Sequence, residues 1–392
     1  MNENIILLTN LASILHPQAE PPYVSLYLPT RARTAQGDDE NRIMLKDVVS
    51  DASEQLAAAF KAHTYENITA YFDDITANLE SIIGPASDGG LAVFIDASGA
   101  YFCRLGYHVE PRAVVGTTYF VRPLLRAFAY GSHYYLLGLS TDRFAFIEGD
   151  CCSLRRLPMP SDIHDEFSEL FTAYDGTEAA LDYEALEGHL SAFHGWKSRN
   201  NVKKEEAEKF FYYVDKAVTE HWAKESPSPI ILVSLPEHQV MFRKLSTVPT
   251  LLDRGIEEAV ETLSEEELLE RAASVLNEKR DLYVRKLIDT YSDEQAHDAA
   301  SSDINDIGLA LAERKVRALF ITENLDMPGI FNETTGEAVQ IDREEHGLHG
   351  DAESKDILDA FAQAALRQDA EVYILPKEEI PSITGAAALF RY

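Results

Sequence analysis

The hydrophobic pattern of the chain changes twice, and these changes limit the folds that it can adopt. Up to about residue 128, short apolar runs stand beside amphipathic helical segments. Between Tyr134 and Leu157, three strand-like segments follow one another across short turns, a pattern typical of an antiparallel meander. From about residue 229, strands alternate with helices, which indicates a parallel or mixed sheet covered by helices. The 392-residue chain is therefore expected to be an α/β protein with three domains: 1–128, 129–226 and 229–392.

Periodicity and turn residues predict the individual elements within this plan. A helical spacing of Leu7, Leu11 and Leu15 opens the chain, and Ser226-Pro227-Ser228-Pro229 is the clearest linker signal. A capping box, Ser264-Glu265-Glu266-Glu267, marks the start of a long helix. Further helices are predicted over 41–60, 205–222, 303–314 and 353–367, and strands over 24–28, 91–95, 101–105, 134–139, 143–148, 153–157, 230–235, 316–322, 372–375 and 386–390.

The chain is strongly acidic, with a formal net charge of −31. A field of that sign repels phosphate backbones, so we do not expect a broad nucleic-acid-binding face, and any such contact must be local. No apolar run approaches the roughly 18 residues that span a bilayer. The short apolar stretch Ile5–Leu8 lacks the basic flank of a signal peptide. We therefore expect a cytoplasmic protein without a membrane partner.

The three cysteines support the same compartment. Cys103 stands alone and Cys151 adjoins Cys152, which is neither a disulfide framework nor the spacing of metal ligands. A vicinal disulfide is rare. Neighbouring residues of a strand point to opposite faces, so we interpret Cys151 and Cys152 as two reduced thiols on a strand.

The segment 194–204 reverses the charge of the chain locally, because it holds no acidic residue. Its basic residues are Lys197, Arg199, Lys203 and Lys204. Such cations pair with phosphates, and Trp196 among them offers a face on which a base can stack. We therefore expect RNA contacts from this segment, Gly195 included. The alternative is a solvated loop whose lysines balance the acidic helix after it, with Trp196 packed on a neighbour.

Short motifs are spread along nearly the whole chain. They are Val24-Ser25-Leu26-Tyr27-Leu28-Pro29-Thr30, Arg42 to Asp47, Gly90 to Phe94, Pro123-Leu124-Leu125, Leu137 to Ser140 with Arg143, Val372 to Pro376, and Gly385 to Tyr392. In order and spacing they resemble the bacterial relatives of the archaeo-eukaryotic translation release factors, in the branch known as family three.

This resemblance implies a three-domain arrangement like that of release factors and Pelota. The middle domain would have a ribonuclease-H-like fold, and the C-terminal domain an α/β/α fold resembling kink-turn-binding ribosomal proteins. The protein would act at the ribosome, in rescue, hibernation or a termination-like reaction, in contact with rRNA or peptidyl-tRNA. We expect no cofactor.

The catalytic motif of release factors is Gly-Gly-Gln, placed just before a long charged helix of the middle domain. Its glutamine places water against the peptidyl-tRNA ester and stabilises the charge that develops there. The matching place here begins His194-Gly195, and no glutamine follows as far as Trp222. The resemblance therefore implies binding without strong catalysis. The alternative is a peptidyl-tRNA hydrolase in which His194 acts as the base, or Asn200 or Asn201 supplies the amide.

Other constellations give weaker hypotheses. The segment Glu344–Asp351 holds two histidines and three carboxylates, but its glycines favour a mobile acidic loop over a metal site, and we predict no metal. No set of carboxylates supports a nuclease. A third possible function is that of an acidic adaptor, which binds a protein partner through its C-terminal domain and does not contact RNA.

Overall fold

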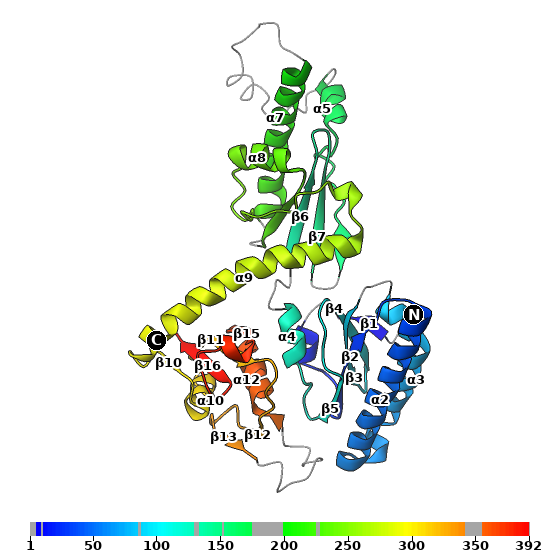
Figure 1. The fold of residues 1–392 in the computed structure, drawn as a ribbon, viewed down its shortest axis with the longest axis vertical. Helices are drawn as coiled ribbons and strands as arrows, with labels where there is room; N and C mark the ends of the chain where they lie inside the picture. The colour runs from blue at the N-terminus through cyan, green and yellow to red at the C-terminus, as the bar shows by residue number, and fades with distance from the viewer. Residues whose placement is uncertain are drawn as a thin grey trace. The chain divides into compact units, whose positions relative to one another are not determined.

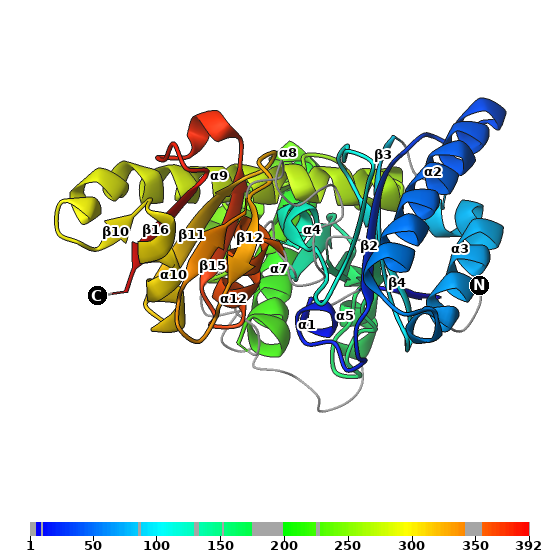
Figure 2. The same ribbon diagram turned by 90° about the horizontal axis from the view of Figure 1, so that it is seen from below.

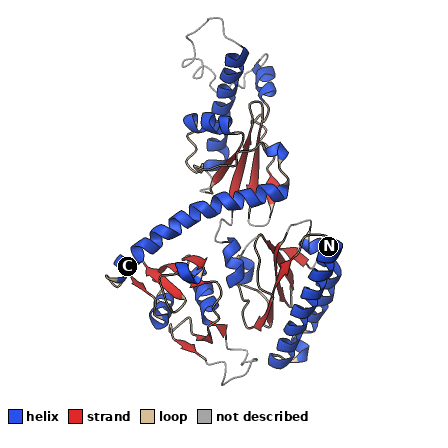
Figure 3. Ribbon diagram, in the orientation of Figure 1, coloured by secondary structure: helices blue, strands red, loops and turns tan. Residues whose placement is uncertain are grey.

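The computed structural model describes residues 5–8, 11–84, 88–128, 133–150, 153–174, 199–224, 228–341 and 355–391. These residues form a mixed α/β protein with several sheets (Figure 3). The chain divides into two compact units (Figure 1). The first unit joins Met1–Ser132 to Glu278–Tyr392, and the second unit is the continuous stretch His133–Asn277.

The N-terminal part of the first unit is a five-stranded sheet in the order β1-β4-β3-β2-β5. β1 is parallel to β4, and the other neighbouring pairs are antiparallel. Two helices bury their apolar sides on this sheet, and in α3 the residues Ile68, Phe72, Ile75 and Leu79 recur every three or four positions. The elements are β1 (Ile5–Leu7), α1 (Ala12–Leu15), β2 (Tyr23–Thr30), α2 (Ala35–Ala59), η1 (Ala62–Thr64), α3 (Glu66–Ile83), β3 (Gly89–Asp96), β4 (Gly99–Leu105), β5 (Arg112–Gly116) and α4 (Arg122–Phe128).

The start of the chain differs from the helical segment that the sequence predicts. Leu7 ends a strand, and the helix comprises only Ala12–Leu15. The strand forms because its backbone pairs with β4, from Ile5 opposite Ala100 to Leu7 opposite Phe102. Leucine spacing holds no information about that distant partner, so strand pairing overrides the local helical pattern.

The C-terminal part of the first unit is a four-stranded sheet in the order β10-β16-β11-β15, with β11 and β15 parallel. Ala318 and Phe320 of β11 pack with Val284 and Tyr291 of α9 on one face. Figure 2 shows α12 on the opposite face, which gives three α/β/α layers. The elements are α9 (Glu265–Gln295), β10 (Ala300–Ser301), α10 (Ile304–Ala312), β11 (Val316–Thr322), α12 (Ile357–Leu366), β15 (Glu371–Leu375), η4 (Lys377–Glu379) and β16 (Ala386–Phe390), with a small sheet of β12 (Pro328–Phe331), β13 (Ala338–Gln340) and β14 (Lys355–Asp356).

The second unit is built on a four-stranded sheet in the order β8-β7-β6-β9. The first three of these strands are consecutive and antiparallel, which confirms the predicted meander. Leu137 and Phe146 pack with α7 and α8 on one face, and Leu136 and Ile231 pack with the first turns of α9 on the other. The elements are β6 (Tyr134–Leu139), β7 (Phe144–Gly149), β8 (Leu154–Arg156), α5 (Phe167–Tyr174), α7 (Arg199–Val218), the π-helical segment η2 (Thr219–Ala223), β9 (Ile230–Val233), α8 (Pro236–Leu245) and η3 (Val260–Thr262).

Strand β9 belongs to this sheet and not, as predicted from the sequence, to the C-terminal part of the chain. It pairs in parallel with β6, from Tyr135 opposite Ile230 to Gly138 opposite Val233. The second unit continues to Asn277, so the division falls inside α9 and not at residue 229. A Ser-Pro linker signal is local, whereas membership of a sheet depends on pairing between distant segments.

Helix α9 begins with the predicted capping box. The backbone N–H of Ser264 donates to Glu267 Oε2 at 2.8 Å, and the N–H of Glu267 donates back to Ser264 Oγ at 3.2 Å. This reciprocal arrangement satisfies two backbone donors at the start of a 31-residue helix. The capping box could be predicted from the sequence because it requires only residues three positions apart.

Candidate nucleic-acid interface

Helix α7 is the element that holds the basic segment on the second unit. Phe210, Phe211 and Val214 are at most 1% exposed and pack on the sheet. Asp215 adds a polar connection, because its carboxylate accepts hydrogen bonds from Ser246 Oγ at 2.7 Å and from the N–H and hydroxyl of Thr247, both at 2.8 Å. The middle of the helix is therefore fixed to the core, and its first turns carry basic residues.

The start of α7 differs from the prediction. The helix begins at Arg199, whereas the predicted helix begins at Glu205 and follows a predicted loop. The stretch 199–205 contains no glycine or proline to stop a helix, and its lysines and glutamate favour one. Helical backbone therefore extends into the basic segment.

The structure places only part of the predicted site. Arg199, Asn200, Asn201 and Lys203 lie on the helical backbone of α7, and Lys204 follows them with an exposed side chain. His194, Gly195, Trp196 and Lys197 lie outside the described residues. The two candidate amides, Asn200 and Asn201, are thus residues of a helix and not of a loop like the one that carries Gly-Gly-Gln.

The first turn of α7 holds no acidic residue. A helix N-terminus carries the positive end of the macrodipole and unpaired backbone N–H groups. A basic side chain there opposes the macrodipole, at a cost of about 0.3–1 kcal/mol. Helix stability therefore does not explain why the cations gather at this end, whereas an anion such as phosphate would offset both sources of positive charge.

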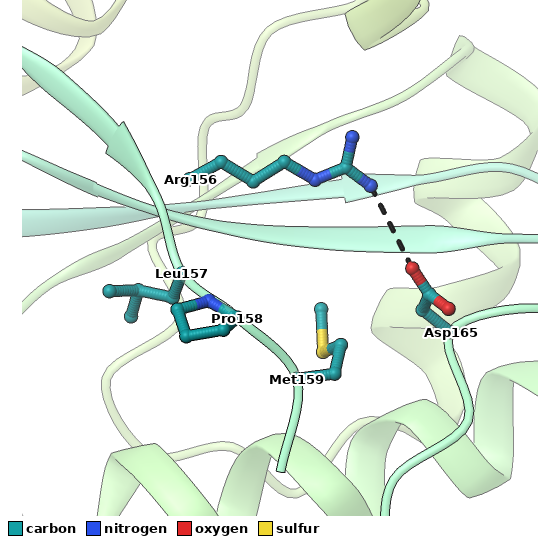
Figure 4. Close-up of a pocket in the computed structure, with 5 residues that line it drawn as sticks. All are labelled: Arg156, Leu157, Pro158, Met159 and Asp165. Atoms are coloured by element: carbon teal, nitrogen blue, oxygen red, sulfur yellow. Dashed lines mark ion pairs between the residues drawn. The ribbon is translucent and has the colours of Figure 1, made fainter. Parts of the chain in front are cut away.

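A shallow hollow of about 400 Å³ lies beside β8 on the same unit (Figure 4). It is lined by Arg156, Leu157, Pro158, Met159 and Asp165. The guanidinium of Arg156 is 3.8 Å from the carboxylate of Asp165, and the two side chains are 66% and 37% exposed. So exposed an ion pair contributes little to stability, which leaves Arg156 able to exchange its partner for another anion. No motif in the sequence marks these residues.

Neither a metal site nor a membrane-spanning helix is found in the described part of the chain. Among the residues that the structure describes, no three His, Cys, Asp or Glu side chains are grouped as metal ligands would be. The segment 344–351 lies outside those residues, as do Cys151 and Cys152, and Cys103 is buried on β4. No helix within the described ranges is long and apolar enough to cross a bilayer.

Part of the chain matches a known protein family. Residues 131–284, which include the basic segment, match bacterial archaeo-eukaryotic release factor family 8. An archaeal translation termination factor, aRF1, is 12% identical over all of both chains, with a TM-score of 0.23. Dom34 of S. cerevisiae, a translation termination-like factor, is 13% identical over 77% of this chain and 79% of its own, with a TM-score of 0.35. No curated protein matches the chain.

A further similar structure is archaeal Pelota, from a model of ribosome-bound Pelota and ABCE1. It is 11% identical over 77% of each chain, with a TM-score of 0.36. The matching family is family 8, whereas the motifs of the sequence suggested family three. The resemblance is therefore confirmed over residues 131–284, which match one of the families of bacterial archaeo-eukaryotic release factors.

Proposed function

We propose that this protein is a translation-associated factor that binds the ribosome through the segment 194–204 and has no strong catalytic activity there. The observation that carries the proposal is the basic start of α7. Within a chain of net charge −31, four cations gather at and before the N-terminus of a helix that is anchored in the family-matching region. Ribosomal RNA offers the phosphates that such a site would bind.

The topology of each part supports the finer domain identities that belong to this proposal. In the second unit, three consecutive antiparallel strands are followed by β9, which is parallel to the first of them, as expected for a ribonuclease-H-like middle domain. In the C-terminal part, helices cover both faces of a mixed sheet, as expected for a relative of kink-turn-binding ribosomal proteins.

The absence of a glutamine from the segment supports a binding role over hydrolysis. A release-type reaction needs a group that positions water and stabilises the developing oxyanion. Asn200 and Asn201 are helical, and a helical backbone restricts where an amide can be placed. Binding without hydrolysis would suit rescue, hibernation or a termination-like checkpoint.

The proposal is tested by co-sedimentation with 70S ribosomes over a range of salt concentrations. The test variant replaces Lys197, Arg199, Lys203 and Lys204 by alanine. The matched control removes the same charge from four exposed lysines elsewhere, namely Lys46, Lys61, Lys244 and Lys377. Loss of four phosphate contacts should lower the slope of log affinity against log salt by about 3, since each contact contributes roughly 0.7 to 0.9.

Two results would contradict the proposal. Equal weakening by the control variant would mean that net charge, and not this segment, governs binding. Absence of binding by the wild-type protein, with and without stalled peptidyl-tRNA, would favour the acidic adaptor, whose protein partner would then be sought with the C-terminal part of the chain.

A further inference from the structure

A row of polar side chains crosses one end of the sheet in the second unit, away from the basic segment in sequence. Each of its four members lies on a different strand or within two residues of the start of one. Arg155 lies on β8, Glu148 on β7, His133 precedes β6, and Ser228 lies shortly before β9. Strand pairing sets the row, because Glu148 is opposite both Arg155 on β8 and Tyr135 on β6.

The row is connected by hydrogen bonds through the histidine ring. Ser228 Oγ lies 2.8 Å from His133 Nδ1, and His133 Nε2 lies 2.8 Å from Glu148 Oε1. The other carboxylate oxygen of Glu148 accepts a hydrogen bond from Arg155 Nε at 3.0 Å. Ser228, His133 and Glu148 therefore form a hydroxyl–imidazole–carboxylate chain, the arrangement that activates a serine nucleophile.

The protonation states follow from the partners. The hydrogen bonds from His133 and Arg155 lower the pKa of Glu148, which keeps its carboxylate ionised and able only to accept. Nε2 of His133 must then carry the proton that it shares with Glu148. In the neutral ring Nδ1 is left as an acceptor, so the hydroxyl proton of Ser228 points at a base.

The surroundings leave the hydroxyl–imidazole–carboxylate group of Ser228, His133 and Glu148 open to a ligand. The side chains of His133 and Glu148 are 37% and 26% exposed, and Ser228 is half-buried. An aromatic series runs along the same face, with ring centroids 4.8 Å apart from His133 to Tyr135, 4.8 Å from Tyr135 to Phe146, and 4.5 Å from Phe146 to Trp222. Trp222 belongs to the π-helical segment Thr219–Ala223, a rare geometry that is frequent at functional sites.

We propose that Ser228 is a nucleophile that accepts acyl groups from activated esters, with His133 as its base and Glu148 as a positioning residue. In the acylation step a bond forms between Ser228 Oγ and the carbonyl carbon, and the bond from that carbon to the leaving oxygen breaks. The proton of the hydroxyl passes to His133 Nδ1 and then to the leaving oxygen. Water then attacks the acyl carbon as His133 takes its proton, the bond from that carbon to Ser228 Oγ breaks, and His133 returns the proton to Oγ, which releases a carboxylic acid and the free hydroxyl.

The test uses p-nitrophenyl acetate as the acyl donor and the full-length protein. We expect a burst of p-nitrophenolate and an acetyl group on the peptide that contains Ser228, detected by mass spectrometry. Ser228→Ala should abolish the modification, and His133→Ala should slow it about 100-fold, the usual contribution of a general base. The matched controls Ser53→Ala and His63→Ala, at exposed positions of the first unit, should behave as the wild-type protein.

The role of Glu148 is read by comparing two variants. Glu148→Gln keeps the size of the side chain but removes its charge, and should slow acetylation. Glu148→Asp keeps the charge and should restore part of the rate, which a purely structural role would not predict. Circular dichroism spectra confirm that each variant is folded.

The proposal is overturned if no acetyl group appears on Ser228, or if His133→Ala is modified at the wild-type rate. Either result would leave the row as a hydrogen-bonded connection between the starts of β6 and β9. The outcome is independent of ribosome binding, since Ser228→Ala should co-sediment with ribosomes as the wild-type protein does.

Discussion

The carboxylate of Asp359 accepts a hydrogen bond of 2.6 Å from the backbone N–H of Arg122, a residue 237 positions earlier in the chain. The N–H of Val121 donates to the same oxygen at 2.8 Å, so Asp359 on α12 holds the start of α4. The side chain of Arg122 is 2% exposed and reaches Asp326 at 3.1 Å and Asp356 at 3.3 Å. These contacts connect the N-terminal and C-terminal parts of the first unit through buried charges.

Replacement of Arg122 by methionine should destabilise the first unit by about 3–5 kcal/mol, because removal of one partner leaves buried carboxylates without compensation. Urea unfolding followed by circular dichroism measures the change. Arg31→Ala is the control, since Arg31 is 52% exposed and its ion pairs should contribute at most about 1 kcal/mol. Equal losses in the two variants would contradict the structural role of Arg122.

Asp359 should make stability depend on pH. Burial, followed by the charge of Asp356, raises the pKa of Asp359 from 3.8 to about 6. Between these values the folded protein holds a proton that the unfolded chain releases. The stability that this bound proton gives the folded state is therefore complete below about pH 4 and is lost as the pH rises through about 6.

Between pH 4 and pH 7, the free energy of unfolding of the wild-type protein should therefore fall by about 3 kcal/mol relative to that of Asp359→Asn. Unfolding free energies measured at several pH values would show this, with the exposed Asp51→Asn as the control. A difference in unfolding free energy between wild type and Asp359→Asn that stays constant with pH would contradict the prediction.

Asp215 should be essential to the anchoring of α7. Its carboxylate accepts three hydrogen bonds from Ser246 and Thr247 while 4% exposed. Asp215→Ala should destabilise the second unit by about 3 kcal/mol or more, since the donors lose a charged acceptor. Thermal unfolding would reveal the change, and Asp142→Ala, on an exposed turn, should have almost no effect.

Trp196 should contribute to ribosome binding separately from charge. Stacking of a base on an aromatic side chain contributes about 1–3 kcal/mol, so Trp196→Ala should weaken binding roughly 5-fold to 160-fold. The salt dependence should remain that of the wild-type protein, because no cation is lost. Tyr212→Ala, which removes a 49% exposed aromatic from α7, is the control. A change in salt slope, or no change in affinity, would contradict the stacking role.

Peptidyl-tRNA hydrolysis should be absent or very slow. Release of labelled peptide from programmed ribosomes should be the same for wild type and His194→Ala. If the wild-type protein releases peptide and His194→Ala does not, the histidine acts as a base and the hydrolase alternative is correct.

Much of the local structure could be predicted from short patterns. Three strand-like segments across short turns at Tyr134–Leu157 predicted the meander. The apolar spacing of Phe210, Phe211 and Val214 predicted a helix, and Ser264 with Glu267 predicted the start of α9. Each of these signals involves residues a few positions apart, whose steric and hydrogen-bonding preferences act locally. The local charge reversal at 194–204 was readable for the same reason.

The tertiary structure decided what lies far apart in sequence. Pairing of β9 with β6 assigned residues after 229 to the second unit and brought Ser228 beside His133, and pairing of β1 with β4 made a strand from an apparent helix. The hydrogen bond from Arg122 N–H to Asp359 likewise joined the N-terminal and C-terminal parts of the first unit. The local preferences of a segment are compatible with many pairing partners. The choice among those partners depends on burial and backbone pairing, which arise only in the folded chain.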